Sequence, residues 1–233
     1  MSQKVTFTWA GFRRGMRLSL PLLIGTAPFG VVCGIVAQGV GLSYLETLLM
    51  SVFVYAGSAE LVAMATWTHP ASPLAAGFAA MVVNLRLALM GPVLAPWLDR
   101  LRGWRLWGSL FVMVDQNWAL SVRAMNEGER DAALLAGMGV PMLAGWIVTS
   151  MLGRVLGAGL RPAPGHPIFF AALAVFICML VTLWRGRRDV LPWAVAGGVA
   201  LAVSRLLPHT SWYIVAGAIA GSLAGAVRDR MGA

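Results

Sequence analysis

Charged residues are scarce in this 233-residue chain: they make up 12% of it, against 59% apolar residues. A soluble globular chain carries about 25% charged residues, so water is not the main solvent of this one. The three histidines, His69, His166 and His209, all lie in links between apolar segments, and no His-Glu-x-x-His run exists. No serine is placed to pair with a histidine at matching depth, as a nucleophile requires. We therefore expect a membrane protein that is not an enzyme and that holds no metal or cofactor.

Cysteine and lysine are also rare. Cys33 and Cys178 each lie inside an apolar segment without metal-ligand spacing, which excludes a disulfide framework and is typical of small buried side chains. Lys4 is the single lysine, so 17 arginines supply most of the formal net charge of +9. These arginines fall in short groups beside apolar segments, which is the pattern that orients membrane helices. No nucleic-acid partner is expected.

Long apolar segments are abundant instead. Eight can be marked, at about 18–40, 45–66, 73–97, 106–124, 131–153, 167–184, 190–207 and 210–227. Most reach the roughly 17 to 25 residues that a spanning helix needs, and this predicts an all-α polytopic membrane protein with six to eight transmembrane segments in one domain, 18–233. Apolar residues recur at helical spacing before the first segment, opposite basic ones, so we expect residues 1–17 to form an amphipathic segment on the cytoplasmic surface.

The basic residues at the segment ends distinguish two topologies, both with a cytoplasmic N-terminus. If all eight segments span, 11 basic residues lie inside and 6 outside, leaving out Arg86. If the second and sixth segments instead enter and leave by the same face, the counts become 14 and 3, and the positive-inside rule favours this arrangement. The sixth segment contains no Gly or Pro between residues 168 and 184, so seven spans, with only the second segment re-entrant, remain an alternative.

The favoured topology gives each half, 18–124 and 131–227, three full spans, which makes the halves an inverted repeat. Pro21-Leu-Leu-Ile-Gly25 and Pro141-Met-Leu-Ala-Gly145 open the two halves 120 residues apart and weakly support a duplication. Inverted repeats place substrate sites at broken or re-entrant helices near the midplane of the bilayer.

Three charges lie well away from the ends of apolar segments: Glu60, Arg86 and Asp115. A guanidinium at the bilayer centre costs about 2.5 to 3.5 kcal/mol even on the lenient insertion scale, so Arg86 must face a partner or a watery cavity. Its planar fork suits a carboxylate. Asp115 is a candidate for a substrate ammonium, and Glu60 for pairing with Arg86 or for taking up a proton. The alternative is an internal ion pair that only holds the bundle together.

Two runs of small residues and proline interrupt these segments. Ala27-Pro28-Phe29-Gly30 predicts either a broken helix that lines a cavity or a simple kink repaired by neighbours. Ala56-Gly57-Ser58-Ala59 leads directly into Glu60 and favours close approach of a substrate or of another helix. Aromatic side chains are candidates for an apolar pocket, namely Phe29, Phe53, Tyr55 and Trp118. The candidate substrate-binding residues are Pro28, Phe29, Gly30, Gly57, Ser58, Glu60, Asn84, Arg86, Asp115 and Gln116.

Several of these pieces together resemble the AzlC family of branched-chain amino acid permeases, the large subunit of the LIV-E type exporters. The matching pieces are Ala27-Pro28-Phe29-Gly30, Tyr55-Ala56-Gly57-Ser58-Ala59-Glu60, Val83-Asn84-Leu85-Arg86, and Val114-Asp115 with Trp118-Ala119-Leu120. The sequence departs from the family pattern at Glu60, where the family usually has Gln, at Leu87, where a His commonly follows the Arg, and at Gln116, where Glu commonly follows the Asp.

The resemblance implies a carrier of the bacterial cytoplasmic membrane that exports branched-chain amino acids. Because the three departures move ionisable groups within the suspected site, the family's substrate and coupling ion do not carry over to this chain, and our own prediction is an exporter of branched-chain or other small hydrophobic amino acids with a proton as the coupling ion. The resemblance also implies a small four-helix membrane subunit of the AzlD type as a partner. Gly217, Gly221 and Gly225 repeat every four residues in the last segment and predict close helix contact, within the bundle or with such a partner. A channel is the alternative, although ion filters generally use rings of one charge sign or backbone carbonyls.

Overall fold

The computed structural model describes residues 5–65, 67, 73–160, 177, 181, 184, 186–207 and 212–231. These residues form helices joined by short links, with one isolated bridge between Thr6 and Asp131, so the all-α prediction is confirmed. The helices are α1 Trp9–Gly39, α2 Tyr44–Phe53, α3 Gly57–Ala65, α4 Pro73–Met90, η1 Gly91–Leu94, α5 Ala95–Leu98, α6 Trp104–Phe111, α7 Asp115–Asn126, α8 Ala133–Leu160, η2 Arg187–Asp189, α10 Val190–Leu206 and α11 Trp212–Met231.

Three helices of the described part are long and apolar enough to cross a membrane, namely Trp9–Gly39, Ala133–Gly159 and Arg187–Leu206. The predicted sixth segment, 167–184, lies almost entirely outside the described residues. The structure therefore bears on the predicted topology mainly through its first five segments.

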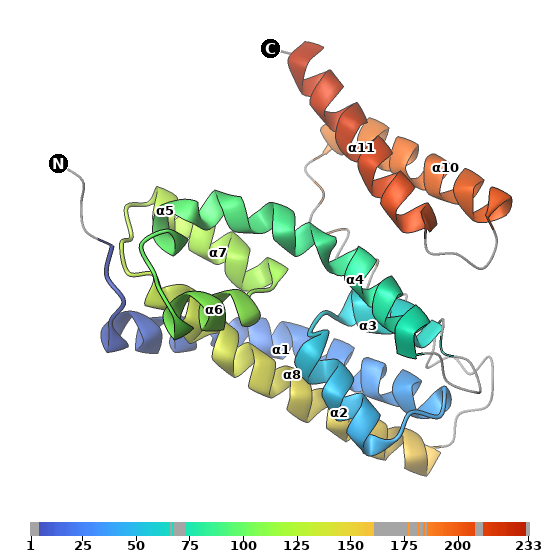
Figure 1. Ribbon diagram of the computed structural model, residues 1–233, viewed down its shortest axis with the longest axis horizontal. Coiled ribbons are helices and arrows are strands. Elements are labelled where there is room, and N and C mark those ends of the chain that lie inside the picture. Colours follow the sequence, from blue (N-terminus) through green and yellow to red (C-terminus); the bar gives the residue numbers. More distant parts are fainter. Residues whose placement is uncertain are drawn as a thin grey trace.

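The two longest helices, α1 and α8, lie side by side and run in the same direction (Figure 1). A Cβ atom on Gly15 would overlap the Leu134 carbonyl oxygen, and one on Gly34 would overlap the Ser150 carbonyl oxygen. Small residues let membrane helices approach this closely. We call the end where both helices begin the proximal end, and the end where both finish the distal end. The inverted arrangement predicted for the two halves is therefore wrong for their first helices, which run in parallel.

Helix α1 begins at Trp9 because Thr8 caps it. The Thr8 side chain accepts a hydrogen bond from the Gly11 N–H at 3.1 Å, and the Thr8 N–H donates to the Asp131 carboxylate at 3.1 Å. At 31 residues the helix is about 46 Å long, which exceeds a hydrocarbon core of about 30 Å. Residues 9–17 are the first turns of this helix, not a separate interfacial segment with a boundary at residue 17.

The second predicted segment is a hairpin that enters and leaves by the distal end (Figure 1). Its arms are α2 and α3, which pack mainly on α8 and on α4 respectively. The Ser51 hydroxyl of α2 links them by donating to the Glu60 carboxylate of α3 at 3.4 Å. At the distal end, the Arg154 guanidinium of α8 lies 4.5 Å from the ring centroid of Tyr44, which begins α2. Met64, near the end of α3, packs with Leu42 in one buried cluster. This course of the chain agrees with the re-entrant segment that the arginine distribution predicted.

The fourth predicted segment is a second hairpin, made of α6 and α7, and it opens to the proximal end (Figure 1). Trp104, at the start of α6, contacts Phe7 with ring centroids 5.8 Å apart. Glu129, just after α7, accepts a hydrogen bond from the Arg14 guanidinium of α1. Both ends of this proximal hairpin thus lie where α1 begins. The sequence predicted a full span here, and that prediction is wrong.

Helix α4 runs from the distal to the proximal end beside the two hairpins, and α10 and α11 pair with each other (Figure 1). Phe78 of α4 meets Trp212 of α11 with ring centroids 6.4 Å apart. A Cβ atom on Gly221 would lie 2.7 Å from the Ala196 Cβ of α10. The glycine repeat of the last segment therefore makes its predicted close contact inside this chain, against α10.

Candidate functional site

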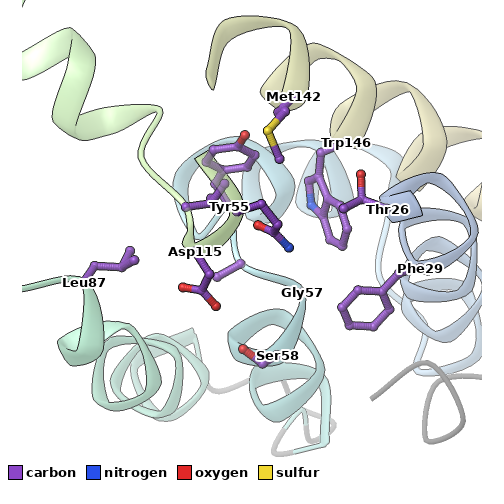
Figure 2. A pocket seen from close by; sticks show the side chains of 12 residues that line it. Thr26, Phe29, Tyr55, Gly57, Ser58, Leu87, Asp115, Met142 and Trp146 are labelled. Atoms are coloured by element: carbon purple, nitrogen blue, oxygen red, sulfur yellow. The ribbon is translucent and has the colours of Figure 1, made fainter. Parts of the chain in front are cut away.

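The tips of the two hairpins meet at a cavity in the middle of the bundle (Figure 2). The cavity has a volume of about 80 Å³, which is small beside the roughly 300 to 1,000 Å³ of pockets that hold small ligands. Five elements contribute to its wall, α1, α4, α8 and the two tips, through Thr26, Phe29, Tyr55, Ala56, Gly57, Ser58, Leu87, Val114, Asp115, Gln116, Met142 and Trp146.

The break between α2 and α3 is held open by side-chain hydrogen bonds. Asn84 of α4 donates from its amide nitrogen to the Val54 carbonyl oxygen at 3.0 Å, which satisfies an acceptor left over by the end of α2. Tyr55 has φ of +44°, a conformation that bulky residues adopt only when their surroundings impose it. Its hydroxyl donates to the Gly139 carbonyl oxygen of α8 at 3.4 Å. The distal tip is therefore tied to α4 and to α8.

Asn117 supports the break between α6 and α7 in the same way. Its amide nitrogen donates to the Val112 carbonyl oxygen at 2.7 Å, and its amide oxygen accepts from the Val114 N–H at 2.8 Å. The side chain is fully buried. Non-helical backbone at membrane depth is tolerated only where its polar groups are satisfied within the protein or by a cavity. One asparagine at each break, Asn84 and Asn117, meets this requirement.

We expect Asn117→Ala to destabilise the protein because it strands both backbone groups of the proximal tip. Leaving two buried polar groups unpaired costs about 2 to 6 kcal/mol, which lowers the Tm by about 4 to 24 °C in a chain of this size. A thermal unfolding scan in detergent measures the change. Asn126→Ala, an exposed substitution at the end of the same helix, is the matched control and should leave the Tm unchanged. Equal Tm values for the two variants would contradict the support role of Asn117.

Asp115 brings a carboxylate to the cavity, and it does so from the first position of α7 (Figure 2). Opposite it lies the beginning of α3, with Gly57 and Ser58 in the cavity wall. The first N–H groups of a helix have no partner within the helix, and the helix dipole makes this end attractive to anions. The site therefore offers a carboxylate for a cation and a helix N-terminus for an anion.

Apolar side chains form the rest of the wall. Phe29 of α1 and Trp146 of α8 stand at an angle of 72° with ring centroids 5.6 Å apart. Tyr55 also lines the cavity, so two of the four predicted aromatic residues are placed there. Phe53 is not, because 71% of it is exposed on the outer face of α2. Trp118 is not either, since it lies among the packed residues of the proximal end and its indole donates to the Met90 carbonyl oxygen at 2.9 Å.

Glu60 lies behind the cavity wall and not in it. Only 2% of the residue is exposed, and its carboxylate accepts hydrogen bonds from the Trp146 indole at 2.8 Å and from the Ser51 hydroxyl at 3.4 Å. The carboxylate thus links both arms of the distal hairpin to a side chain of α8 that faces the cavity. A change in the charge of Glu60 would act on the site through Trp146.

The remaining predicted residues fall into different places. Of the ten candidates, five line the cavity: Phe29, Gly57, Ser58, Asp115 and Gln116. Helix α1 continues through Pro28 without a break, which agrees with the kink alternative. Gly30 faces Thr149 of α8, where a Cβ atom would overlap the Thr149 side chain. Arg86 belongs to α4, and its side chain lies outside the described residues, as do its predicted ion pairs.

Six cavity residues are absent from the ten candidates and from the four predicted aromatic residues, namely Thr26, Ala56, Leu87, Val114, Met142 and Trp146. Trp146 could have been predicted as a site residue, because it lies in the middle of an apolar segment. Tryptophans of membrane proteins are usually found at the membrane interfaces instead. Met142 and Thr26 could not have been predicted in this way, since each is an ordinary residue of a long apolar helix. The parallel contact of α1 and α8 brings them to the cavity.

Comparisons with known proteins agree with this architecture. The sequence profile of the AzlC family, described as AzlC protein, matches residues 21–160. The chain belongs to the AzlC family. The matched range contains both hairpins and every cavity residue. No solved structure matches the chain significantly.

Relatives cover most of the chain. A membrane protein of Archaeoglobus fulgidus, named only as uncharacterized, is 30% identical over 92% of this chain and 94% of its own length. The inner membrane protein YgaZ of Escherichia coli K12 is 26% identical over 92% of the chain and 89% of its own length. The branched-chain amino acid transport protein AzlC of Bacillus subtilis 168 is 24% identical over 85% of the chain and 77% of its own length. This member of the AzlC family is accordingly a membrane protein.

Proposed function

We propose that this protein carries small hydrophobic amino acids across the bacterial inner membrane and that the cavity between the hairpin tips is the binding site. The observation that carries the proposal is the meeting of a helix N-terminus, a carboxylate and apolar side chains in one cavity. A zwitterionic amino acid needs these three features. Its carboxylate lies at the N-terminal end of α3, its ammonium on Asp115, and its side chain against Phe29, Met142 and Trp146.

The size of the cavity makes movement of the hairpins part of the mechanism. At about 80 Å³ it must widen to admit an amino acid. The cavity is lined by the tips of both hairpins, and the distal hairpin extends from its tip to the distal end, whereas the proximal hairpin extends to the proximal end (Figure 1). Moving one hairpin tip at a time exposes the site to one face at a time, which is what alternating access requires.

The orientation follows from the arginines of α1 to α8. Those at the proximal end are Arg13, Arg14, Arg17, Arg100, Arg102, Arg105, Arg123 and Arg130, whereas Arg154 lies at the distal end. The positive-inside rule favours a cytoplasmic proximal end and hence a cytoplasmic N-terminus. The family resemblance supports export as the direction. The proposed coupling ion is a proton, because Glu60 and Asp115 are carboxylates within the bundle that are in a position to carry it.

A small AzlD-type subunit is the proposed partner. None of the described residues of α10 is buried within this chain, although the helix is apolar. Lipid or a second membrane subunit therefore covers it. Co-purification of a small four-helix membrane protein with the tagged chain tests this part of the proposal, and a chain that transports at full rate alone would contradict an obligatory partner.

Counterflow in reconstituted vesicles tests the substrate and the mode of transport. Vesicles loaded with unlabelled leucine should accumulate labelled leucine, and external valine or isoleucine should compete. Isopentylamine, which lacks the carboxylate, and 4-methylpentanoate, which lacks the ammonium, should compete at least about tenfold less well, because each loses one charge-assisted contact. Large single-channel conductance without counterflow would instead favour the channel alternative. Equal competition by all four compounds would contradict the proposed binding mode.

A further inference from the structure

A second cavity lies at the proximal end, away from the hairpin tips. It has a volume of about 600 Å³ and lies between the beginning of α1, the outer face of α6 and the first turns of α8. The lining is mostly apolar, and its aromatic members are Phe7, Trp9, Phe12, Trp104 and Phe111. We call this cavity the proximal groove. Its volume falls within the range of ligand pockets, and no step of the proposed transport cycle uses it.

One cation, Arg105, belongs to the lining of the proximal groove. Its guanidinium carbon lies 5.4 Å from the centroid of the Phe7 ring and 5.9 Å from that of Trp104, so cation–π contacts hold it in place. The residue is exposed and forms no salt bridge with the acidic residues of the described chain. The groove therefore has a largely apolar surface with one positive charge, that of Arg105, which no acidic side chain of the groove lining neutralises.

The surroundings of the groove indicate an interface with lipid. Trp9, Trp104 and Trp107 are 67%, 73% and 69% exposed, and exposed tryptophans at the end of a membrane helix bundle lie at headgroup level. The groove follows α6 past Gly108 and Ser109 to Val112, at the break of the proximal hairpin. A ligand that fills it must have an anionic group at its interfacial end and an apolar chain that reaches about one helix arm into the bilayer.

We propose that the proximal groove binds one anionic phospholipid of the leaflet at the proximal end, with the phosphate on Arg105 and an acyl chain along α6. Basic pockets between membrane helices bind such headgroups. The acyl chain packs on the outer arm of the proximal hairpin, so the bound lipid braces the arm that ends at Val112. The inference does not depend on which solute the protein transports.

Native mass spectrometry of the delipidated full-length protein tests the proposal directly. Titration with dioleoyl phosphatidylglycerol should give one tight adduct, and dioleoyl phosphatidylcholine, which has the same acyl chains, should bind at least about tenfold more weakly. Arg105→Gln should weaken the phosphatidylglycerol adduct by a similar factor and weaken the phosphatidylcholine adduct much less, because the choline ammonium already offsets the charge of that phosphate. Arg102→Gln is the matched control, because Arg102 is exposed in the link just before α6 but lies outside the groove.

A second variant tests the position of the acyl chain. A Cβ atom on Gly108 would meet no atom within 4 Å, so Gly108→Phe should fold and fill the groove, whereas Gly108→Ala should leave room for the lipid. We expect Gly108→Phe to abolish the tight phosphatidylglycerol adduct and Gly108→Ala to keep it. Wild-type lipid affinity in both Arg105→Gln and Gly108→Phe would overturn the proposal. So would a membrane protein that co-purifies with the wild type, is lost in Gly108→Phe, and displaces phosphatidylglycerol.

Discussion

Asp115→Asn is expected to lower the initial rate of leucine counterflow at least about 100-fold. The carboxylate of Asp115 lines the cavity, and it is the group that we assign to the substrate ammonium. Removing one partner of a buried ion pair costs about 3 to 5 kcal/mol, and each 1.4 kcal/mol is a factor of ten. Asparagine has nearly the same shape, so the fold should tolerate it, and the expression level and the Tm should stay near those of the wild type.

Asp99→Asn is the matched control for this prediction. Asp99 is an exposed carboxylate after α5, outside the cavity, and its loss should leave counterflow unchanged. Counterflow by Asp115→Asn at more than half the wild-type rate would remove Asp115 from the binding site. A parallel loss of Tm would instead indicate that the carboxylate only holds the bundle together, and this would also contradict its assigned role.

Gly57→Val is expected to abolish counterflow by filling the cavity. A Cβ atom on Gly57 would overlap the Phe29 ring and lie 2.7 Å from the Trp146 ring, so valine must enter the space that we assign to the substrate. Both rings belong to one packed cluster with Tyr55 and Cys33, and they have little room to retreat. The measurement is the counterflow rate together with the Tm, and Gly57→Ala should lie between the wild type and Gly57→Val.

Gly77→Val provides the control, because a Cβ atom on Gly77 would meet no atom within 4 Å and the residue is exposed on α4. It adds the same side chain to a helix of the same bundle without entering the cavity. Transport by Gly57→Val at the wild-type rate would show that the substrate does not pass the distal tip. The assignment of the cavity would then be wrong.

The arginine distribution predicted one of the two hairpins and could not predict the other. Re-entrance of the second and fourth segments also leaves 14 basic residues inside and 3 outside, the same counts as re-entrance of the second and sixth. Arg123 and Arg130 exchange sides with Arg154 and Arg161, two residues for two. Charge counting is blind to such an exchange, so the wrong topology satisfied the positive-inside rule as well as the right one does.

The error in the topology also led to the error about the repeat. Two re-entrant segments between α1 and α8 leave α4 as the one full crossing between them, so α1 and α8 must run in the same direction. The two similar stretches that begin at Pro21 and Pro141 do lie beside each other in the parallel pair. Leu23 of the first stretch lies so close to Gly145 of the second that a Cβ atom on Gly145 would overlap it. Sequence similarity between the two stretches does not show whether the two helices run in the same or in opposite directions. The similarity was therefore compatible with an inverted arrangement and with a parallel one.

The candidate site was predictable where a polar residue or a glycine interrupts an apolar segment. Polar residues and glycines in the middle of an apolar segment need a structural or functional reason. This reasoning identified four cavity residues, Asp115, Gln116, Gly57 and Ser58. The same reasoning could not separate residues that face the cavity from residues that support it. Both Glu60 and Asp115 are carboxylates that are costly to place inside a membrane. Glu60 nevertheless lies behind Trp146, whereas Asp115 lines the cavity. Only the fold determines which buried polar group touches the substrate.

Labelling of introduced cysteines tests the opposed hairpins most directly, in a chain whose native Cys33 and Cys178 are replaced by alanine. Tyr44→Cys and Ala65→Cys place a thiol at the two ends of the distal hairpin, where both residues are exposed. Arg102→Cys and Glu127→Cys do the same for the proximal hairpin. A membrane-impermeant maleimide is applied to intact cells and, separately, to inverted membrane vesicles.

The account predicts that Tyr44→Cys and Ala65→Cys react only in intact cells, and that Arg102→Cys and Glu127→Cys react only in inverted vesicles. If either hairpin were a full span, the two cysteines of that pair would react from opposite sides. That result would contradict two re-entrant tips meeting at a single cavity.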